Sequence, residues 1–243
     1  TSVPRGLVPG RSGYTIAARH RQIRDRLVSE IERVSRYSSS KGGDSPVVYA
    51  HRIFDISGSK FHVLTRIVDA GSDYTGRTNY LAHHLICDSE ELSRSGTHPA
   101  EILFSFDWLY SFEGEPKYLE DSDIVELSSY KGNIKLPAAN WKSLRGEAAD
   151  AALLVATKSK AKNSILVFED SDKSIEKKLI LLVGESAKLL SSPNEIAFTT
   201  FFQEGDAMSD FQWIGCEAGS SIVQKPTNRE IVRLNNIGQE SPQ

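Results

Sequence analysis

The fold is decided by three successive runs of sequence, PVVYAHRIFDI at residues 46–56, KFHVLTRIVDA at 60–70 and TNYLAHHLIC at 78–87. Each run is rich in β-branched and aromatic residues, which favour strands. The first two runs are separated only by Ser57-Gly58-Ser59, a short glycine-containing segment typical of a hairpin loop. The three runs therefore predict an antiparallel meander in the N-terminal half.

The C-terminal half alternates between helical and extended patterns. Its sequence predicts helices at 142–157 and 174–190 and strands at 164–169 and 195–203. A strand, a helix and a strand in this spacing indicate a parallel βαβ-like crossover, right-handed if both strands share a sheet. Two shorter strands are predicted at 212–214 and 221–224. We thus expect an α+β protein, with an antiparallel meander followed by a mixed sheet.

An amphipathic helix is predicted before the meander, over residues 19–37. Ile23, Leu27, Ile31 and Val34 recur at helical spacing, while the other faces carry six arginines. Because no aromatic residues alternate with these arginines, a solvated or docking face is favoured over a nucleic-acid interface. After the meander, short helices are predicted within 89–104, and residues 105–140 are expected to form a long connecting segment.

The length of 243 residues suits one large domain or two small ones. We expect a single domain over 1–243, which can divide into an antiparallel lobe (1–140) and an α/β lobe (141–235), followed by a polar tail (236–243). Residues 1–80 have 13 Lys and Arg against 7 Asp and Glu, whereas the rest has a net charge of −9, so the halves can attract each other. Aromatic residues on both faces of its strand predict that Phe198–Gly215 forms the seam between them.

Several sequence features bear on the compartment. No apolar run is long enough to span a bilayer, and residues 1–13 lack the apolar stretch of a secretory signal. The two cysteines, Cys87 and Cys216, are too few for a disulfide scaffold. We therefore expect a cytoplasmic protein with no membrane partner. Because the chain starts at Thr1 and its only methionine is Met208, we also expect it to be part of a longer protein.

The densest polar cluster lies in the loop before the third strand, DYTGRTN at residues 73–79. It combines hydroxyl groups, a glycine that can take a positive φ and a guanidinium suited to carboxylate or phosphate. This composition suits a ligand or partner site as well as ordinary turn chemistry. The candidate binding residues are Asp73, Tyr74, Thr75, Arg77 and Asn79.

The sequence offers weaker candidates for catalysis than for binding, namely His83, His84 and Cys216. Adjacent His83 and His84 on one strand point to opposite faces, so they cannot chelate one metal together, and no other ligand spacing predicts a metal site. The glycine-rich opening, residues 6–13, lacks the lysine and spacing of a phosphate-binding loop, and no cofactor is predicted. Cys216, between two glycines, could act as a nucleophile with either histidine as base, but nothing in the sequence brings them together.

Several motifs taken together resemble the N-terminal domain, type two, of bacterial GTPase-associated proteins. The motifs are RGLVPGRSG at 5–13, YAHR at 49–52, TRIVD at 65–69, DYTGRTN at 73–79 and LAHH at 81–84, with FTTF at 198–201 and WIGC at 213–216 as later landmarks. The resemblance implies a place in NTP-dependent bacterial conflict or signalling systems, where gene neighbourhoods pair such a domain with a GTPase and with further domains. It supplies no catalytic residues.

Three classes of function follow from these features. We expect a non-enzymatic adaptor or sensor domain that binds a small ligand or a protein partner, either a GTPase or further domains of the same polypeptide, through residues 73–84. The alternative is a hydrolase or transferase that uses His83 or His84, with or without Cys216. Nucleic-acid binding by the arginine-rich helix is a third hypothesis.

Overall fold

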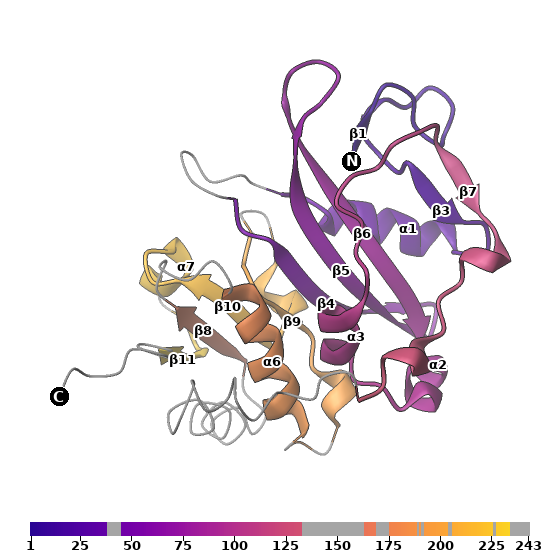
Figure 1. The fold of residues 1–243 in the computed structure, drawn as a ribbon. Coiled ribbons are helices and arrows are strands. Elements are labelled where there is room, and N and C mark those ends of the chain that lie inside the picture. The colour runs from indigo at the N-terminus through magenta and orange to yellow at the C-terminus, as the bar shows by residue number, and fades with distance from the viewer. Residues whose placement is uncertain are drawn as a thin grey trace.

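The structure is a computed structural model that describes residues 1–37, 45–132, 163–168, 175–188, 190, 192–203, 206–225 and 227–233. In this part of the chain, seven strands form one mixed sheet in the order β11-β8-β10-β9-β4-β5-β6 (Figure 1). The strands are β4 (Val48–Ile56), β5 (Ser59–Ser72), β6 (Thr78–Asp88), β8 (Ser164–Phe168), β9 (Phe198–Thr199), β10 (Trp213–Glu217) and β11 (Glu230–Arg233). The expected α+β class is confirmed.

The predicted meander is formed by β4, β5 and β6, which pair antiparallel. Its first turn is a two-residue loop in which Ser57 and Gly58 both have positive φ, the backbone that matches the twist of a tight hairpin. This turn fixes the register, so that Ile53 lies opposite His62 and His51 lies opposite Leu64. The hairpin between β5 and β6 extends beyond the body of the sheet (Figure 1).

The C-terminal strands β11, β8, β10 and β9 run parallel to one another. The crossover runs from β8 through helix α6 (Ile175–Lys188) to β9, with β10 between the two strands. Within the strand expected at 195–203, only β9 is extended and paired, and the 3-10 helix Pro193–Glu195 overlaps its first residue. The helix predicted at 142–157 lies outside the described residues.

The strand predicted at 221–224 is wrong. These residues form helix α7 (Ser221–Gln224), and the strand that follows is β11. The cause is the shortness of the segment, because four residues cannot distinguish a period of 2 from one of 3.6. Only Ile222 is buried there, in an apolar cluster with β8 and β10 residues.

The seam between the two halves is β9. It pairs antiparallel with β4 on one side and parallel with β10 on the other, so the antiparallel and parallel parts form one continuous sheet. Phe198 of β9 is fully buried, whereas Phe201 is only half-buried and contacts the Phe168 ring. A side chain at Gly215 of β10 would collide with the Thr200 carbonyl, which shows how closely the segments approach here.

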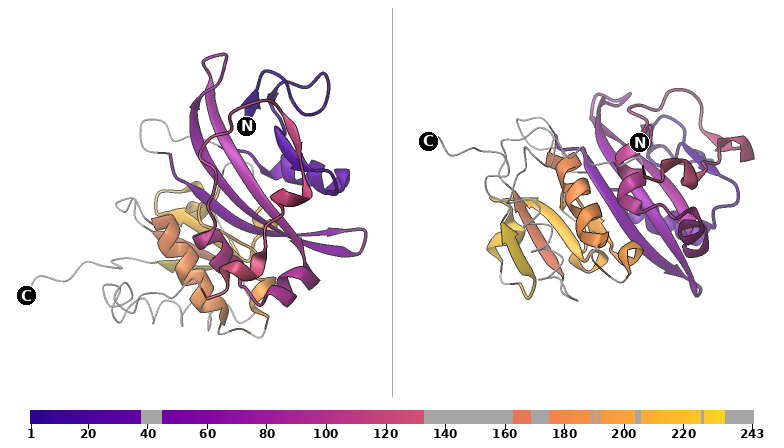
Figure 2. Two further views of the ribbon diagram at one scale, coloured as in Figure 1. Left: turned by 45° about the vertical axis from the view of Figure 1, so that its right-hand side comes forward. Right: turned by 60° about the horizontal axis from the view of Figure 1, so that its bottom comes forward.

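Helices cover both faces of the sheet (Figures 1 and 2). On one face lie α2 (Ser89–Ser95), α3 (Pro99–Ser105) and α6, over the largest apolar cluster. On the other face, α1 (Asp25–Val34) packs Leu27 and Ile31 on β4 and β5. The helix predicted from residue 19 begins only at Asp25, because residues 18–20 pair with another strand.

Two small sheets complete the described structure. β1 (Ser2–Val3) pairs with β2 (Gly13–Tyr14), and β3 (Ala18–His20) pairs with β7 (Lys117–Leu119). The predicted connecting segment after α3 contains β7 and two short 3-10 helices, Asp121–Asp123 and Leu127–Tyr130. A further 3-10 helix, Met208–Asp210, precedes β10. No helix in the described ranges is both long and apolar enough to cross a bilayer.

Candidate functional site

Asp73 organises the loop between β5 and β6. Its Oδ1 accepts hydrogen bonds from the Thr75 amide at 2.8 Å, the Thr75 hydroxyl at 2.6 Å and the Arg77 amide at 3.0 Å. Its Oδ2 accepts from the Ser2 hydroxyl at 2.9 Å and from Arg77 Nη2 at 3.1 Å. These bonds, led by that from the Thr75 hydroxyl, hold the pKa of the buried Asp73 carboxyl well below its usual range. The loop is therefore shaped around one carboxylate.

Asn79 attaches the N-terminus to the same hairpin. Its Oδ1 accepts from the Ser2 amide at 2.9 Å and from the Thr1 hydroxyl at 3.3 Å. Next to it, the Tyr14 and Tyr80 rings stack at 4.8 Å, and the Tyr14 hydroxyl donates to a backbone carbonyl of the hairpin. Asn79 and Asp73 thus hold the hairpin in place rather than facing solvent.

The remaining predicted binding residues form the exposed tip of the hairpin. Tyr74 is 53% exposed, and the Arg77 side chain is 61% exposed. Arg77 Nε donates to the Thr75 hydroxyl at 2.8 Å, so the guanidinium is held in one orientation. The structure therefore separates the predicted cluster into supporting residues and a rigid tip that carries an aromatic ring and a cation.

His83 and His84 lie on opposite faces of β6, as the strand pattern predicts. His83 packs edge-on against Phe106 and Trp108, and its Nδ1 accepts from the Leu109 amide at 3.3 Å. Burial, followed by the charge of Arg66, lowers the pKa of His83 to about 4. This imidazole is therefore neutral at pH 7 and helps to hold the segment after α3 against the sheet.

His84 connects the sheet to the end of α1. Its Nε2 lies 3.1 Å from the Ser35 hydroxyl, which itself donates to the Ile31 carbonyl. His84 Nε2–H is therefore the donor to Ser35, and Nδ1 accepts from the Thr65 hydroxyl at 2.9 Å. Burial lowers the pKa of His84 to about 3. Both ring nitrogens are thus used in structural hydrogen bonds.

Cys216 is not brought together with either histidine. It lies buried on β10, and strands β9, β4 and β5 separate it from β6, which at the usual strand spacing is about 19 Å. Burial raises the pKa of its thiol to about 12, so the thiolate is scarce at neutral pH. The structure therefore offers no thiol–imidazole pair at these positions.

A groove of about 1700 Å³ runs beside β6. It is lined by every residue from Tyr80 to Asp88, by α1, by β3 and β7, and by residues of the segment after α3. Because successive strand residues point to opposite faces, a groove that touches all of them meets the edge of the strand. β6 is the last strand of the sheet, and within the described residues no strand pairs with its outer edge.

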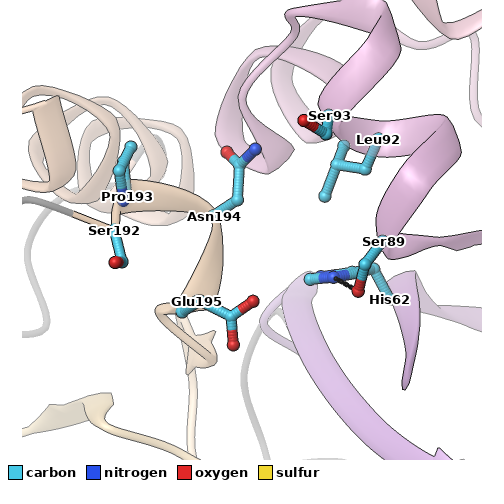
Figure 3. A pocket seen from close by; sticks show the side chains of 8 residues that line it. All are labelled: His62, Ser89, Leu92, Ser93, Ser192, Pro193, Asn194 and Glu195. Atoms are coloured by element: carbon cyan, nitrogen blue, oxygen red, sulfur yellow. Dashed lines mark hydrogen bonds between the residues drawn. The ribbon is translucent and has the colours of Figure 1, made fainter. Parts of the chain in front are cut away.

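A smaller pocket of about 220 Å³ lies between α2 and the 3-10 helix Pro193–Glu195, beside His62 and Ser89 (Figure 3). This pocket was not predicted from the sequence. The two-residue turn after β4 already places His51 and His62 diagonally on one face of two paired strands, and that register was the available signal. The position of Ser89 could not be predicted, because it depends on how α2 packs on β5.

No group of three or more His, Cys, Asp or Glu side chains suited to a metal ion occurs among the described residues. A family model described as GTPase-associated protein 1, N-terminal domain type 2, matches residues 1–124. Neither a search of curated proteins nor a search of solved structures found a match. The matched residues include β4, β5, β6, the hairpin tip and both histidines of β6.

Proposed function

Since the chain belongs to the family of GTPase-associated protein 1 N-terminal domains of type 2, we propose that it is an adaptor domain. It acts in a cytoplasmic bacterial conflict or signalling system, where it binds the system's GTPase. Its docking surface consists of the hairpin tip, residues 74–77, and the free edge of β6. The hairpin joins these two parts directly, so one partner can contact both.

The free edge of β6 is the observation that carries the proposal. An edge strand presents backbone N–H and C=O groups that can pair with an added strand, and native proteins usually protect such edges. Here the edge lies along a groove that leaves room beside it, with the side chains of Leu85, Ile86, Phe106 and Leu109 among its lining. An extended segment of the partner can therefore join the sheet as an eighth strand and place alternate side chains against these apolar groups.

The hairpin tip adds side-chain recognition. Tyrosine and arginine are the residue types that most often dominate binding energy at protein interfaces. Tyr74 and Arg77 stand on a loop whose shape is fixed by Asp73, so little conformational freedom is lost when they bind. The tip is therefore suited to anchor the partner, while the strand edge extends the contact.

The proposal is tested by measuring binding of the GTPase encoded beside this protein to wild type and to the double variant Tyr74→Ala, Arg77→Ala. We expect the double variant to bind at least about tenfold more weakly, with unchanged thermal unfolding. Arg94→Ala is the matched control, because Arg94 is also an exposed arginine paired with a carboxylate four residues away. Equal affinity of the double variant and wild type for the GTPase would show that the tip is not part of the docking surface.

A further inference from the structure

The smaller pocket contains a chain of hydrogen bonds that begins at a serine. Ser89 Oγ lies 3.0 Å from His62 Nε2, His62 Nδ1 lies 2.9 Å from His51 Nε2, and His51 Nδ1 lies 2.8 Å from the Ile196 carbonyl (Figure 3 shows the first bond). The two imidazole planes are within 14° of parallel. Both histidines are buried, whereas Ser89 is half-buried and lines the pocket.

The backbone carbonyl determines the direction of every bond in this chain. A carbonyl oxygen can only accept, so His51 Nδ1 carries a proton and, in the neutral ring, Nε2 is an acceptor. His62 Nδ1 must then donate to His51, which leaves His62 Nε2 without a proton. The Ser89 hydroxyl therefore donates to His62 Nε2, which is the arrangement of a nucleophile with its general base.

We propose that Ser89 and His62 form a nucleophile and base for acyl transfer, with His51 as the positioning residue that orients His62. This inference goes beyond docking. Ser89 and Lys60 also line the groove beside β6, but the hairpin tip, residues 74–77, lines neither cavity, so variants of the tip and of the pocket test the two proposals separately. The proposal also differs from the hydrolase expected from sequence, because it uses neither His83, His84 nor Cys216. The same logic of serine, base and orienting group defines known triads on unrelated folds.

The ionisation of the two histidines suits these roles. Burial lowers the pKa of His62 and lowers that of His51 to about 3, so both are neutral at pH 7. The charged groups that act on His62 are Glu195, Lys60 and Asp88. A neutral His62 can accept the serine proton, and the resulting imidazolium keeps its Nδ1–H bond to His51.

The wall opposite Ser89 is held rigidly. The His98 ring lies 3.2 Å from the Pro193 carbonyl through Nε2, and Gln212 donates to the Glu195 carbonyl at 3.2 Å. His51 holds the same segment at Ile196. This wall carries the Asn194 amide into the pocket on the side facing α2 (Figure 3). Asn194 supplies a side-chain amide donor to the pocket lining, and in the proposed mechanism its Nδ2 stabilises the oxyanion that forms when an acyl group is attacked.

The reaction is an ordinary two-step acyl transfer. Ser89 Oγ forms a bond to the carbonyl carbon of an ester while its proton moves to His62 Nε2. The carbon–oxygen bond to the alcohol then breaks, and the alcohol leaves with that proton. Water attacks the resulting acyl-serine, His62 takes a proton from it, and the carboxylic acid is released as Ser89 regains its proton. No redox partner or metal is needed.

The size and lining of the pocket define the substrate class. A volume of about 220 Å³ is below the range of drug-sized ligand sites, so it accepts a short acyl group. Leu92 and Pro193 supply apolar contact for such a chain. The Glu195 carboxylate lines the same pocket and is paired with Lys60 at 2.6 Å at its rim. We therefore infer that the substrates are short-chain esters whose acyl group carries no negative charge.

The site is tested with a fluorophosphonate probe on the full chain. The probe forms an Oγ–phosphorus bond and releases fluoride, so labelling adds a defined mass to the peptide that contains Ser89. We expect labelling of wild type at Ser89, none in Ser89→Ala, and unchanged labelling in Ser122→Ala, which alters an exposed serine outside the pocket. p-Nitrophenyl butyrate should be hydrolysed by wild type and by the control variant but not by Ser89→Ala. Wild type should hydrolyse the butyrate ester faster than the palmitate ester.

Variants of the supporting residues separate their roles. His62→Ala should slow labelling at least about 100-fold, the usual range for loss of a general base. Asn194→Ala should slow ester hydrolysis by a similar factor, the usual range for loss of an oxyanion donor. His51→Gln keeps an acceptor for His62 and should retain labelling, with a shifted midpoint in the pH dependence of the rate, whereas a purely structural residue would leave that midpoint unchanged.

Three results would overturn the proposal: no label at Ser89 in natively folded protein, equal labelling of Ser89→Ala and wild type, or equal loss of labelling in Ser122→Ala and Ser89→Ala. The docking variant Tyr74→Ala, Arg77→Ala should label like wild type. Loss of labelling therefore reports on the pocket alone, and loss of GTPase binding reports on the docking surface alone.

Discussion

The Ser2 hydroxyl donates a 2.9 Å hydrogen bond to the Asp73 carboxylate, and this buried contact ties the start of the chain to the hairpin between β5 and β6. The same carboxylate accepts from Thr75 and Arg77. One side chain therefore fixes both the shape of the hairpin tip and the position of the N-terminal segment against it. The tip can present Tyr74 and Arg77 in a defined geometry only while this carboxylate is charged.

Replacing Asp73 with Asn should lower the melting temperature. It should also make the melting temperature depend less on pH in the acid range. Because the folded pKa of Asp73 lies below its unfolded value near 3.9, its contribution to stability is complete above about pH 4 and is lost as the pH falls further. Thermal unfolding between pH 2.5 and pH 7 checks this. The same acid slope in wild type and Asp73→Asn would show that the carboxylate does not stabilise the fold.

The buried histidines should make the protein sensitive to mild acid. The pKa values of His51 and His84 are about 3 and that of His83 is about 4, all below the unfolded value near 6.5. The unfolded chain therefore binds more protons between these values, and stability is complete above pH 6.5 and falls as the pH drops towards 4. Each histidine contributes a slope of up to about 1.4 kcal/mol per pH unit.

Denaturant unfolding at pH 4.5 to 7 measures this slope. The variant His84→Gln should be less stable than wild type at pH 7. Its unfolding free energy should also depend less steeply on pH, by up to about 1.4 kcal/mol per pH unit. An unchanged slope in this variant would mean that His84 is protonated in the folded protein, against the hydrogen bonds to Thr65 and Ser35.

At the seam, truncating Phe198 should lower the free energy of unfolding far more than truncating Phe201. Phe198 is fully buried on β9, so Phe198→Ala should cost about 3–5 kcal/mol of unfolding free energy. Phe201 is only half-buried, so Phe201→Ala should cost less. Urea unfolding of the two variants decides the matter, and equal costs would contradict the packing at the seam.

Much of the fold was accessible from local sequence patterns. The meander was predicted because its strands are long and the first two are joined by a tight turn, so local propensity and pairing agree. The errors came from short segments. Residues 18–20 continue the basic pattern of α1, yet they pair with β7 about a hundred residues later. Such distant pairing leaves no local pattern in the sequence.

The candidate sites show the same limit. The exposure of Tyr74 and Arg77 agrees with the predicted loop, but the supporting role of Asp73 depends on Ser2, which is distant in sequence. The neighbouring positions of His51 and His62 were predictable from the register of the first hairpin. Their link to Ser89 and to Ile196 was not, because it needs the packing of α2 and of the segment before β9 on the sheet.

Pairing of a GTPase segment with the outer edge of β6 is tested most directly by amide hydrogen exchange. Exchange is measured residue by residue along β6, with and without the bound GTPase. In the free protein, the amides that face β5 should exchange slowly and the alternate amides on the outer edge should exchange fast. If a segment of the partner pairs with β6, protection should appear at every second residue between 80 and 87. A complex that forms without any new protection on β6 would contradict the account.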